Sequence, residues 1–142
     1  MTGGDKDVLL AFDFGFRRLG IATANLQTRT ASPLTTLKTA AGLPWEELDR
    51  IVADWAPARF VVGMPTGAGT EQVARAARKF AAALEARYHR PVETVDETLT
   101  SEAARSEIAA GRRSGFLRRR VSKGALDRVA ACLIAEAWMS GT

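Results

Sequence analysis

The amino-acid sequence predicts an α/β fold in which helices cover both faces of a mixed five-stranded sheet. The chain has 142 residues, the length of one domain with its own hydrophobic core, and we expect a single domain over residues 1–142. Three strand-like segments come first, and helical and strand-like segments then alternate. Consecutive strands favour antiparallel pairing, whereas alternation favours parallel strands joined by helices, so the sheet should contain both kinds.

The first three strands are expected to form an antiparallel meander. Val8–Phe12 is a continuous apolar run, the pattern of a strand that is buried on both faces. Leu19–Ala24 and Ser32–Leu37 follow as the second and third strands. The polar segment Asn25–Thr30 is expected to form the turn between them.

A helix and a fourth strand are expected next. Apolar residues recur at helical spacing between Trp45 and Trp55. Pro44 suits the first helical position, and Pro57 marks the end of the helix. The short apolar run Phe60–Met64 then predicts a buried strand.

A second helix and a fifth strand complete the predicted sheet. After a loop at Gly67–Gly69, Thr70 can cap a helix whose apolar face runs from Val73 to Tyr88. Pro91–Asp96 is expected to be the fifth strand.

The C-terminal part is expected to hold two more helices on either side of a basic segment. One helix should begin at about Ser101 and stop at Gly111. The last helix can be capped by Ser122. Its buried stripe is expected to comprise Leu126, Val129, Ala130, Leu133, Ile134, Ala137 and Trp138.

Carboxylates at the edges of these elements are candidates for a metal site. They are Asp13 after the first strand, Asp96 and Glu97 after the fifth, and Asp127 early in the last helix. A carboxylate beside a buried strand end is costly to ionise without compensation, which a divalent cation can provide. Neighbouring strand residues point to opposite faces, so only one of Asp96 and Glu97 can face a given site.

Each of these acids also has an ordinary structural interpretation. Asp13 can be a turn former, and the other acids can be charges at helix N-termini. The grouping of such positions, rather than any one of them, favours a metal site. Two metal ions can clamp a phosphodiester, with one activating water and the other stabilising the leaving oxygen.

The basic residues are concentrated in one segment. Residues 111–123 carry six basic side chains and no acid, although the formal net charge of the whole chain is only +4. The six are Arg112, Arg113, Arg118, Arg119, Arg120 and Lys123. This concentration favours contact with a polyanion such as a phosphate backbone. A solvated surface loop is the alternative interpretation.

Several classes of protein are excluded by what the sequence lacks. It has no Cys/His spacing for zinc, no P-loop and no Gly-x-Ser-x-Gly motif. No stretch approaches the roughly 20 apolar residues of a membrane span, and the first apolar run is too short for a signal peptide. We therefore expect a cytoplasmic protein with no membrane partner.

Four short motifs occur in order over nearly the whole chain. They are Ala11–Gly15 with Arg18, Gly20, Ile21 and Ala22; Val62–Pro65 with Gly69, Thr70 and Glu71; Asp96 and Glu97 with Leu99, Thr100 and Ser101; and Lys123 and Gly124 with Asp127, Ala130 and Ala131. Together they resemble the motifs of the YqgF family, whose members are described as pre-16S rRNA nucleases or Holliday junction resolvases. Phe16, Thr98 and the short loop Thr66–Ala68 depart from the family's usual pattern.

The resemblance implies a ribonuclease H-like fold with a site for one or two Mg²⁺ or Mn²⁺ ions. By matching motif, the catalytic and metal-binding residues would be Asp13, Glu97 and Asp127. The nucleic-acid-binding residues would be Arg18 together with the six basic side chains of residues 111–123.

The expected function is metal-dependent hydrolysis of phosphodiester bonds, with the 5′ end of precursor 16S rRNA as the favoured substrate. A Holliday junction resolvase acting on four-way DNA is the alternative within the same chemistry. A nucleic-acid-binding protein without turnover would need the basic segment but not all three acids. A phosphotransferase related to actin or sugar kinases needs two domains to enclose a nucleotide, so no nucleotide cofactor is expected. The oligomeric state is left open.

Overall fold

The computed structural model describes residues 5–96 and 123–141. The elements in chain order are β1 (Asp5–Phe14), β2 (Arg18–Asn25), β3 (Thr30–Lys38), α1 (Trp45–Trp55), β4 (Pro57–Met64), α2 (Glu71–Tyr88), β5 (Val92–Asp96) and α4 (Lys123–Ser140). The expected helix from about Ser101 to Gly111 and the expected cap Ser122 lie outside the described residues. None of the described helices has the length and hydropathy that a membrane crossing requires.

The strands form one mixed sheet in the order β3-β2-β1-β4-β5. β2 pairs with β1 and β3 in antiparallel fashion, whereas β4 pairs in parallel with β1 and β5. The predicted sheet, with its opening meander and later parallel strands, is therefore confirmed. The first four strands extend beyond their apolar runs, because ladder hydrogen bonds depend on the partner backbone rather than on side-chain polarity.

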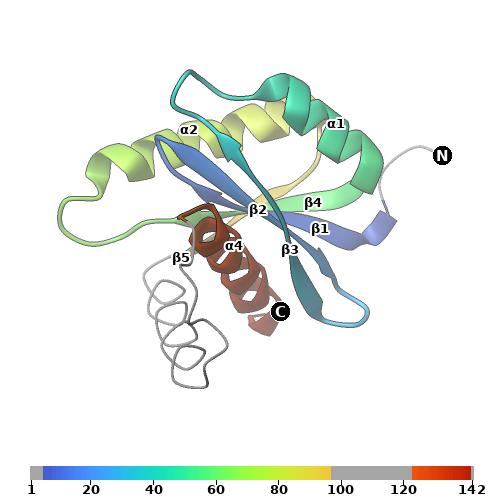
Figure 1. Cartoon of the computed structure of the whole chain (residues 1–142). Coiled ribbons are helices and arrows are strands. Elements are labelled where there is room, and N and C mark those ends of the chain that lie inside the picture. Colours follow the sequence, from blue (N-terminus) through green and yellow to red (C-terminus); the bar gives the residue numbers. More distant parts are fainter. Residues whose placement is uncertain (1–4, 97–122, 142) are drawn as a thin grey trace.

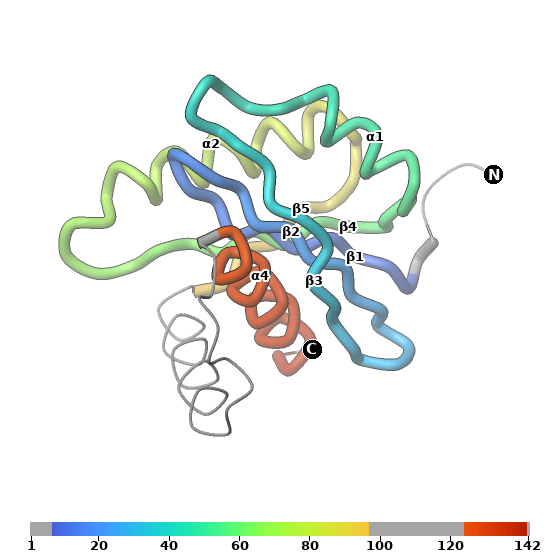
Figure 2. The backbone as a smooth tube through the Cα atoms, viewed as in Figure 1, coloured from blue at the N-terminus to red at the C-terminus, as the bar shows by residue number. Residues whose placement is uncertain are grey.

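Helices cover both faces of this sheet, as predicted. Figure 1 shows α1 and α2 on one side and α4 on the other, and the same separation is visible along the chain path in Figure 2. Leu10 and Phe12 of β1 join the buried cluster under α1 and α2, while Leu9 and Ala11 join the cluster under α4. This alternation follows from the opposite directions of successive side chains on a strand, and it assigns a face to each residue from Leu9 to Phe14.

The buried stripe of α4 agrees with the expected one at Ile134 and differs from it elsewhere. The buried residues are Ala131, Ile134, Ala135 and Met139, whereas Leu126 is 38% exposed. α4 is apolar on nearly every side, so its spacing does not single out one stripe. Ala135 packs in the same cluster as Ala11 and Ala24, where small side chains let the helix approach the sheet closely.

Two expected helix starts also differ in detail. Pro44 stands at the N-cap of α1 rather than at its first helical position. Thr70 precedes α2 as expected, but its hydroxyl donates to the carbonyl of Gly67 at 2.7 Å and does not cap the helix. The hydroxyl of Thr70 thus closes the loop that precedes α2.

An ion pair joins α1 to α2 on the face away from α4. Arg87 donates two hydrogen bonds to the carboxylate of Asp49, at 2.7 and 2.6 Å, and the hydroxyl of Tyr88 donates a third at 2.6 Å. The guanidinium of Arg87 also lies 4.9 Å from the centre of the Trp45 ring. The hydrogen bonds from Arg87 and Tyr88 lower the pKa of Asp49 to about 2.

This lowered pKa predicts a specific loss of stability in acid. A carboxyl group with a depressed pKa in the folded state stabilises the protein above its unfolded pKa of about 4. That contribution disappears as the pH falls through the folded pKa of about 2. Asp49→Asn should therefore unfold more easily in urea than the wild type at pH 7, and this difference should shrink between pH 4 and pH 2. Asp54→Asn, at an exposed carboxylate of the same helix, is the matched control. If the stability difference between Asp49→Asn and the wild type were the same at pH 7 and at pH 2, the lowered pKa of Asp49 would be contradicted.

Candidate active site

A row of three paired residues crosses the sheet on the face covered by α4. Asp13 of β1 is paired with Gly20 of β2, and Gly20 is paired with Thr36 of β3. Asp13 shares its face with Leu9 and Ala11, which pack under α4. The first turns of α4 lie over this row. Asp13 stands inside β1 rather than at its end as expected, because the strand continues to Phe14.

Gly20 allows the backbone of α4 to approach the sheet. A Cβ atom at this position would overlap the backbone carbonyl of Asp127 and would lie 2.8 Å from the Cβ of Asp127. Any other residue type would push the helix away. The missing side chain of Gly20 therefore places Asp127 next to the strand that carries Asp13.

Hydrogen bonds fix both ends of α4. The hydroxyl of Thr36 donates to the carbonyl of Gly124 at 2.7 Å, and Arg128 donates to the same hydroxyl at 3.2 Å. At the far end, the guanidinium of Arg29 donates to the carbonyl of Met139. The position of Asp127 over the sheet is therefore held by contacts on either side of it.

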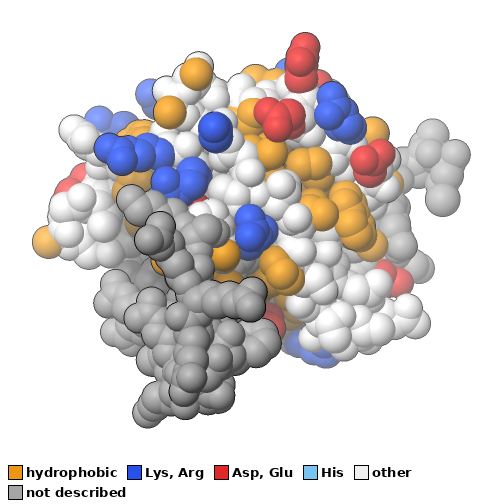
Figure 3. Space-filling view, viewed as in Figure 1, with side chains coloured by type: hydrophobic (Ala, Val, Ile, Leu, Met, Phe, Trp, Pro, Cys, Tyr) orange, Lys and Arg blue, Asp and Glu red, His pale blue; other side chains and the backbone are white. Residues whose placement is uncertain are grey.

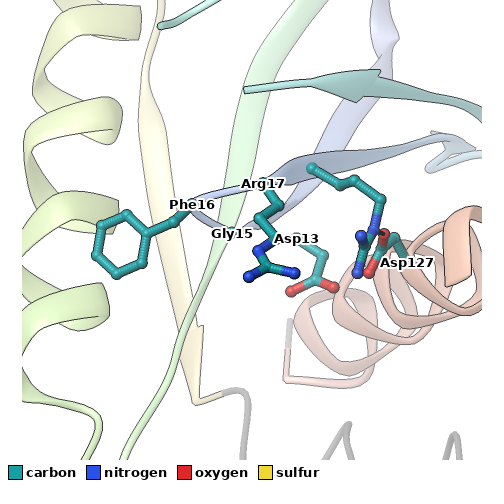
Figure 4. Close-up of a pocket in the computed structure, with 6 residues that line it drawn as sticks. Asp13, Gly15, Phe16, Arg17 and Asp127 are labelled. Atoms are coloured by element: carbon teal, nitrogen blue, oxygen red, sulfur yellow. Dashed lines mark hydrogen bonds and ion pairs between the residues drawn. The ribbon is translucent and has the colours of Figure 1, made fainter. Parts of the chain in front are cut away.

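Asp13 and Asp127 line one pocket of about 300 Å³. Its other lining residues are Gly15, Phe16, Arg17 and Arg18, which follow β1 and lead into β2. Figure 4 shows the carboxylates of Asp13 and Asp127 on the same side of the β1–β2 hairpin, with the guanidinium of Arg17 near Asp13 and the ring of Phe16 pointing away. The pocket thus combines two acids from distant parts of the chain with two consecutive arginines where the loop after β1 enters β2.

Arg18 is paired with Asp127 inside this pocket. Its Nε atom donates to Oδ2 of Asp127 at 2.7 Å. The two side chains are 34% and 21% exposed, so solvent screens the pair only in part. The carboxylate of Asp127 is therefore already in contact with one positive charge, that of the Arg18 guanidinium. Arg18 is thus the partner of a candidate metal ligand as well as an expected nucleic-acid contact.

The loop between β1 and β2 is held by Thr39. The Thr39 hydroxyl donates to the carbonyl of Gly15 at 2.8 Å, and the Thr39 backbone N–H donates to the carbonyl of Arg17 at 2.9 Å. Thr39 is itself buried. The backbone that carries Phe16 and Arg17 is therefore fixed by the residue that follows the edge strand β3.

Asp96 lies on the opposite face of the sheet from Asp13. It is paired with Met64, which packs against the cluster under α1 and α2, whereas Val95 packs under α4. The hydroxyl of Thr66 donates to Oδ1 of Asp96 at 3.0 Å. Of the two adjacent acids that the sequence left open, Asp96 is therefore not directed at the pocket of Asp13.

The other expected site residues fall at or beyond the limits of the described structure. Glu97 and the basic residues Arg112, Arg113, Arg118, Arg119 and Arg120 lie outside the described residues. Lys123 is the first residue of α4, and only its backbone is described.

Two residues that line the pocket were missed by the sequence analysis. Phe16 and Arg17 lie between Asp13 and Arg18, so their position in the loop between two candidate residues was the available signal. Phe16 was noted only as a departure from the family pattern. Gly20 belonged to a motif, but its contact with α4 joins segments that are far apart in sequence.

The sequence matches a family model and several named bacterial proteins. A family model described as "RuvX: Holliday junction resolvase" matches residues 7–141. A protein of Glaesserella parasuis named "Putative pre-16S rRNA nuclease" is 44% identical over 136 residues, which cover 94% of this chain and 96% of that protein. A Legionella pneumophila protein of the same name is 36% identical over 137 residues, with the same coverage of 94% and 96%.

Two solved structures share the fold at low sequence identity. Thermus thermophilus RuvC, solved as "T. thermophilus RuvC in complex with Holliday junction substrate", matches with a TM-score of 0.59 and 18% identity, over 95% of this chain and 96% of that one. The fowlpox virus Holliday junction resolvase matches with a TM-score of 0.56 and 13% identity, over 95% and 99%. These likenesses confirm the expected ribonuclease H-like architecture.

Proposed function

The chain belongs to the RuvX (YqgF) family of nucleases, and on this premise we propose that it hydrolyses phosphodiester bonds of precursor 16S rRNA at the pocket of Asp13 and Asp127. One observation carries the proposal. Two carboxylates from β1 and α4 line the same pocket as two arginines. Acids are suited to hold divalent cations, and arginines are suited to attract the phosphate that such cations act on. The family resemblance expected from the sequence is confirmed by the family match.

The residues of the pocket fit one or two Mg²⁺ or Mn²⁺ ions. Both cations prefer oxygen ligands, and Mg²⁺ usually keeps several waters besides one or two carboxylates. Asp13 and Asp127 supply the carboxylates, and a pocket of about 300 Å³ leaves space for waters as well. Glu97 is proposed as the third ligand, which is supported by the orientation of Asp96 toward the other face. When bound, the metal would activate a water and stabilise the departing oxygen.

The side chains around the acids would hold and orient the substrate. β1 fixes the backbone of Asp13, and the close contact at Gly20 fixes the backbone of Asp127, so both acids start from defined positions beside the pocket. Arg17 is exposed beside them and can meet a phosphate oxygen, while Arg18 is already paired with Asp127. We expect Arg18 to shift part of its hydrogen bonding to the substrate phosphate when a cation takes its place.

Further basic side chains lie near the β1–β2 hairpin, outside the pocket lining. Figure 3 shows Lys and Arg side chains gathered around the end of the β1–β2 hairpin and α2. Arg75, Arg78 and Lys79 of α2 are exposed. From the charge pattern of the sequence we also propose as nucleic-acid contacts Arg112, Arg113, Arg118, Arg119, Arg120 and Lys123. Such a distribution would bind a phosphate backbone with little dependence on sequence and with strong dependence on salt.

A Holliday junction resolvase acting on four-way DNA is the second candidate. It is favoured by the description of the matching family and by the shared fold with two junction resolvases. The names of the relatives at 44% and 36% identity favour the RNA substrate instead. A single-domain organisation over residues 1–142 and a cytoplasmic location stay predictions in either case.

Cleavage of two substrates side by side separates these functions. We would incubate the protein and Mg²⁺ or Mn²⁺ with 5′-extended 16S rRNA precursor and with a synthetic four-way DNA junction. Cleavage of the RNA that is lost in Asp13→Asn would support the processing nuclease, while cleavage of the junction alone would favour the resolvase. Asp7→Asn changes a carboxylate at the other end of β1 and should cleave like the wild type. Intact binding without cleavage of either substrate would indicate a nucleic-acid-binding protein without turnover.

A further inference from the structure

Phe16 is exposed although its side chain is large and apolar. It is 55% exposed, more than Trp55 or Leu126, the other exposed large hydrophobic residues in the described part of the chain. A single exposed apolar side chain is common on protein surfaces and needs no explanation by itself. Phe16, however, lines the same pocket as Asp13 and Asp127. A substrate held at Asp13 and Asp127 would therefore pass close to Phe16.

The ring of Phe16 is held in place although it is exposed. Its centre lies 6.2 Å from that of Phe14, with the two rings at 77° to each other. Phe14 in turn contacts Phe80 of α2, with 5.4 Å between ring centres. The loop backbone on either side of Phe16 is bonded to Thr39. A ring supported in this way loses little conformational freedom when a flat partner packs on its accessible part.

The partner best suited to this position is a nucleobase. Figure 4 shows the ring pointing away from the carboxylates, so a group packed on it would lie beside the cleavage centre rather than within it. The adjacent Arg17 points toward Asp13 and supplies a cation for a phosphate. A ring and a guanidinium on neighbouring residues could meet the base and the phosphate of adjoining parts of one strand. A base inside a duplex is already stacked on both sides, so only an unpaired or splayed base can reach the ring.

We propose that Phe16 stacks on an unpaired nucleobase next to the scissile phosphate and thereby favours cleavage beside an unpaired nucleotide. The cleavage part of this inference rests on the proposed nuclease function, whereas the stacking contact does not. Stacking on an aromatic side chain tolerates any base, because every base has a flat face. Phe16 would therefore select the local structure of the substrate rather than its sequence.

The test measures binding without requiring cleavage. The probes are short RNAs with 2-aminopurine at successive positions of an unpaired segment, and fully paired duplexes of the same sequence. Ca²⁺ replaces Mg²⁺ so that the strands stay intact during the measurement. We expect the full-length wild-type protein to quench 2-aminopurine at one unpaired position. Phe16→Ala should abolish this quenching and weaken binding of the unpaired probe by about 5- to 150-fold, with duplex binding nearly unchanged.

Two further variants separate stacking from simple apolar contact. Phe16→Trp keeps an aromatic face and should retain both quenching and affinity. Phe16→Leu keeps an apolar side chain without that face and should behave like Phe16→Ala. The inference is overturned if Phe16→Ala binds both probes as tightly as the wild type does, or if it loses the same affinity for both probes. It is also overturned if Phe16→Leu quenches 2-aminopurine as the wild type does.

The outcome is also distinguishable from a failure of the proposed function. Quenching that depends on Phe16 in a protein that cleaves nothing would support the stacking contact and contradict the nuclease. Metal-dependent cleavage with no effect of Phe16 on unpaired probes would support the nuclease and contradict the stacking contact.

Discussion

Replacing Asp127 by asparagine is expected to lower metal-dependent cleavage by about a thousandfold while the protein stays folded. Asp127 brings one of the two described carboxylates to the pocket, and asparagine has nearly the same shape without the negative charge. Losing charge at a metal site forfeits several kcal/mol of transition-state stabilisation, and each tenfold in rate corresponds to about 1.36 kcal/mol. The rate should be measured under single-turnover conditions at several Mg²⁺ concentrations.

A loss of cleavage in Asp127→Asn could also come from the loss of the ion pair between Asp127 and Arg18. If Asp127 served only to hold Arg18, its replacement would remove one partly exposed ion pair, which contributes less than about 1 kcal/mol to stability. Cleavage within tenfold of the wild type at saturating Mg²⁺ would then be observed, and would contradict a role in metal binding. Glu136→Gln, at an exposed acid of the same helix, is the control and should leave the rate unchanged.

Replacing Gly20 by alanine is expected to destabilise the protein by about 3 kcal/mol and to abolish most of the cleavage. The added methyl group would overlap the backbone carbonyl of Asp127, and neither the strand nor the helix backbone can rotate away as a side chain would. Overpacking of a core typically costs about 1–3 kcal/mol, and a clash between two backbones belongs at the upper end. Urea denaturation measures the loss of stability, and cleavage at a temperature where the variant is folded measures the displacement of Asp127.

Gly124→Ala is a matched control for this change. Gly124 lies on the same contact between α4 and the sheet, but its added Cβ would lie 3.4 Å from the hydroxyl oxygen of Thr36, an ordinary contact distance. Alanine also suits a helix better than glycine, so this variant should be as stable as the wild type or slightly more stable. Equal stabilities for the variants at Gly20 and Gly124 would show that α4 can move without cost, and that Gly20 does not position Asp127.

The architecture of the sheet could be predicted because it depends on local sequence patterns. Apolar runs and turn residues place the strands, and helical spacing places α1 and α2, since side-chain direction depends on the nearby backbone. The same reasoning placed the helix α4 but identified only Ile134 of its buried face. Most of its residues are apolar, and its contact with Ala11 and Ala24 decides which of them are buried.

The sequence by itself determined the order of the elements, the mixed sheet and the acids worth testing. The tertiary structure decided which of these acids meet. Arg18 and Asp127 are 109 positions apart, and their contact depends on the missing side chain of Gly20 and on the hydrogen bonds at both ends of α4. The pairing of Asp96 with Met64 likewise turns it to the opposite face. Local periodicity fixes the direction of a side chain relative to its own element, whereas a site shared by two elements depends on how closely their backbones can pack.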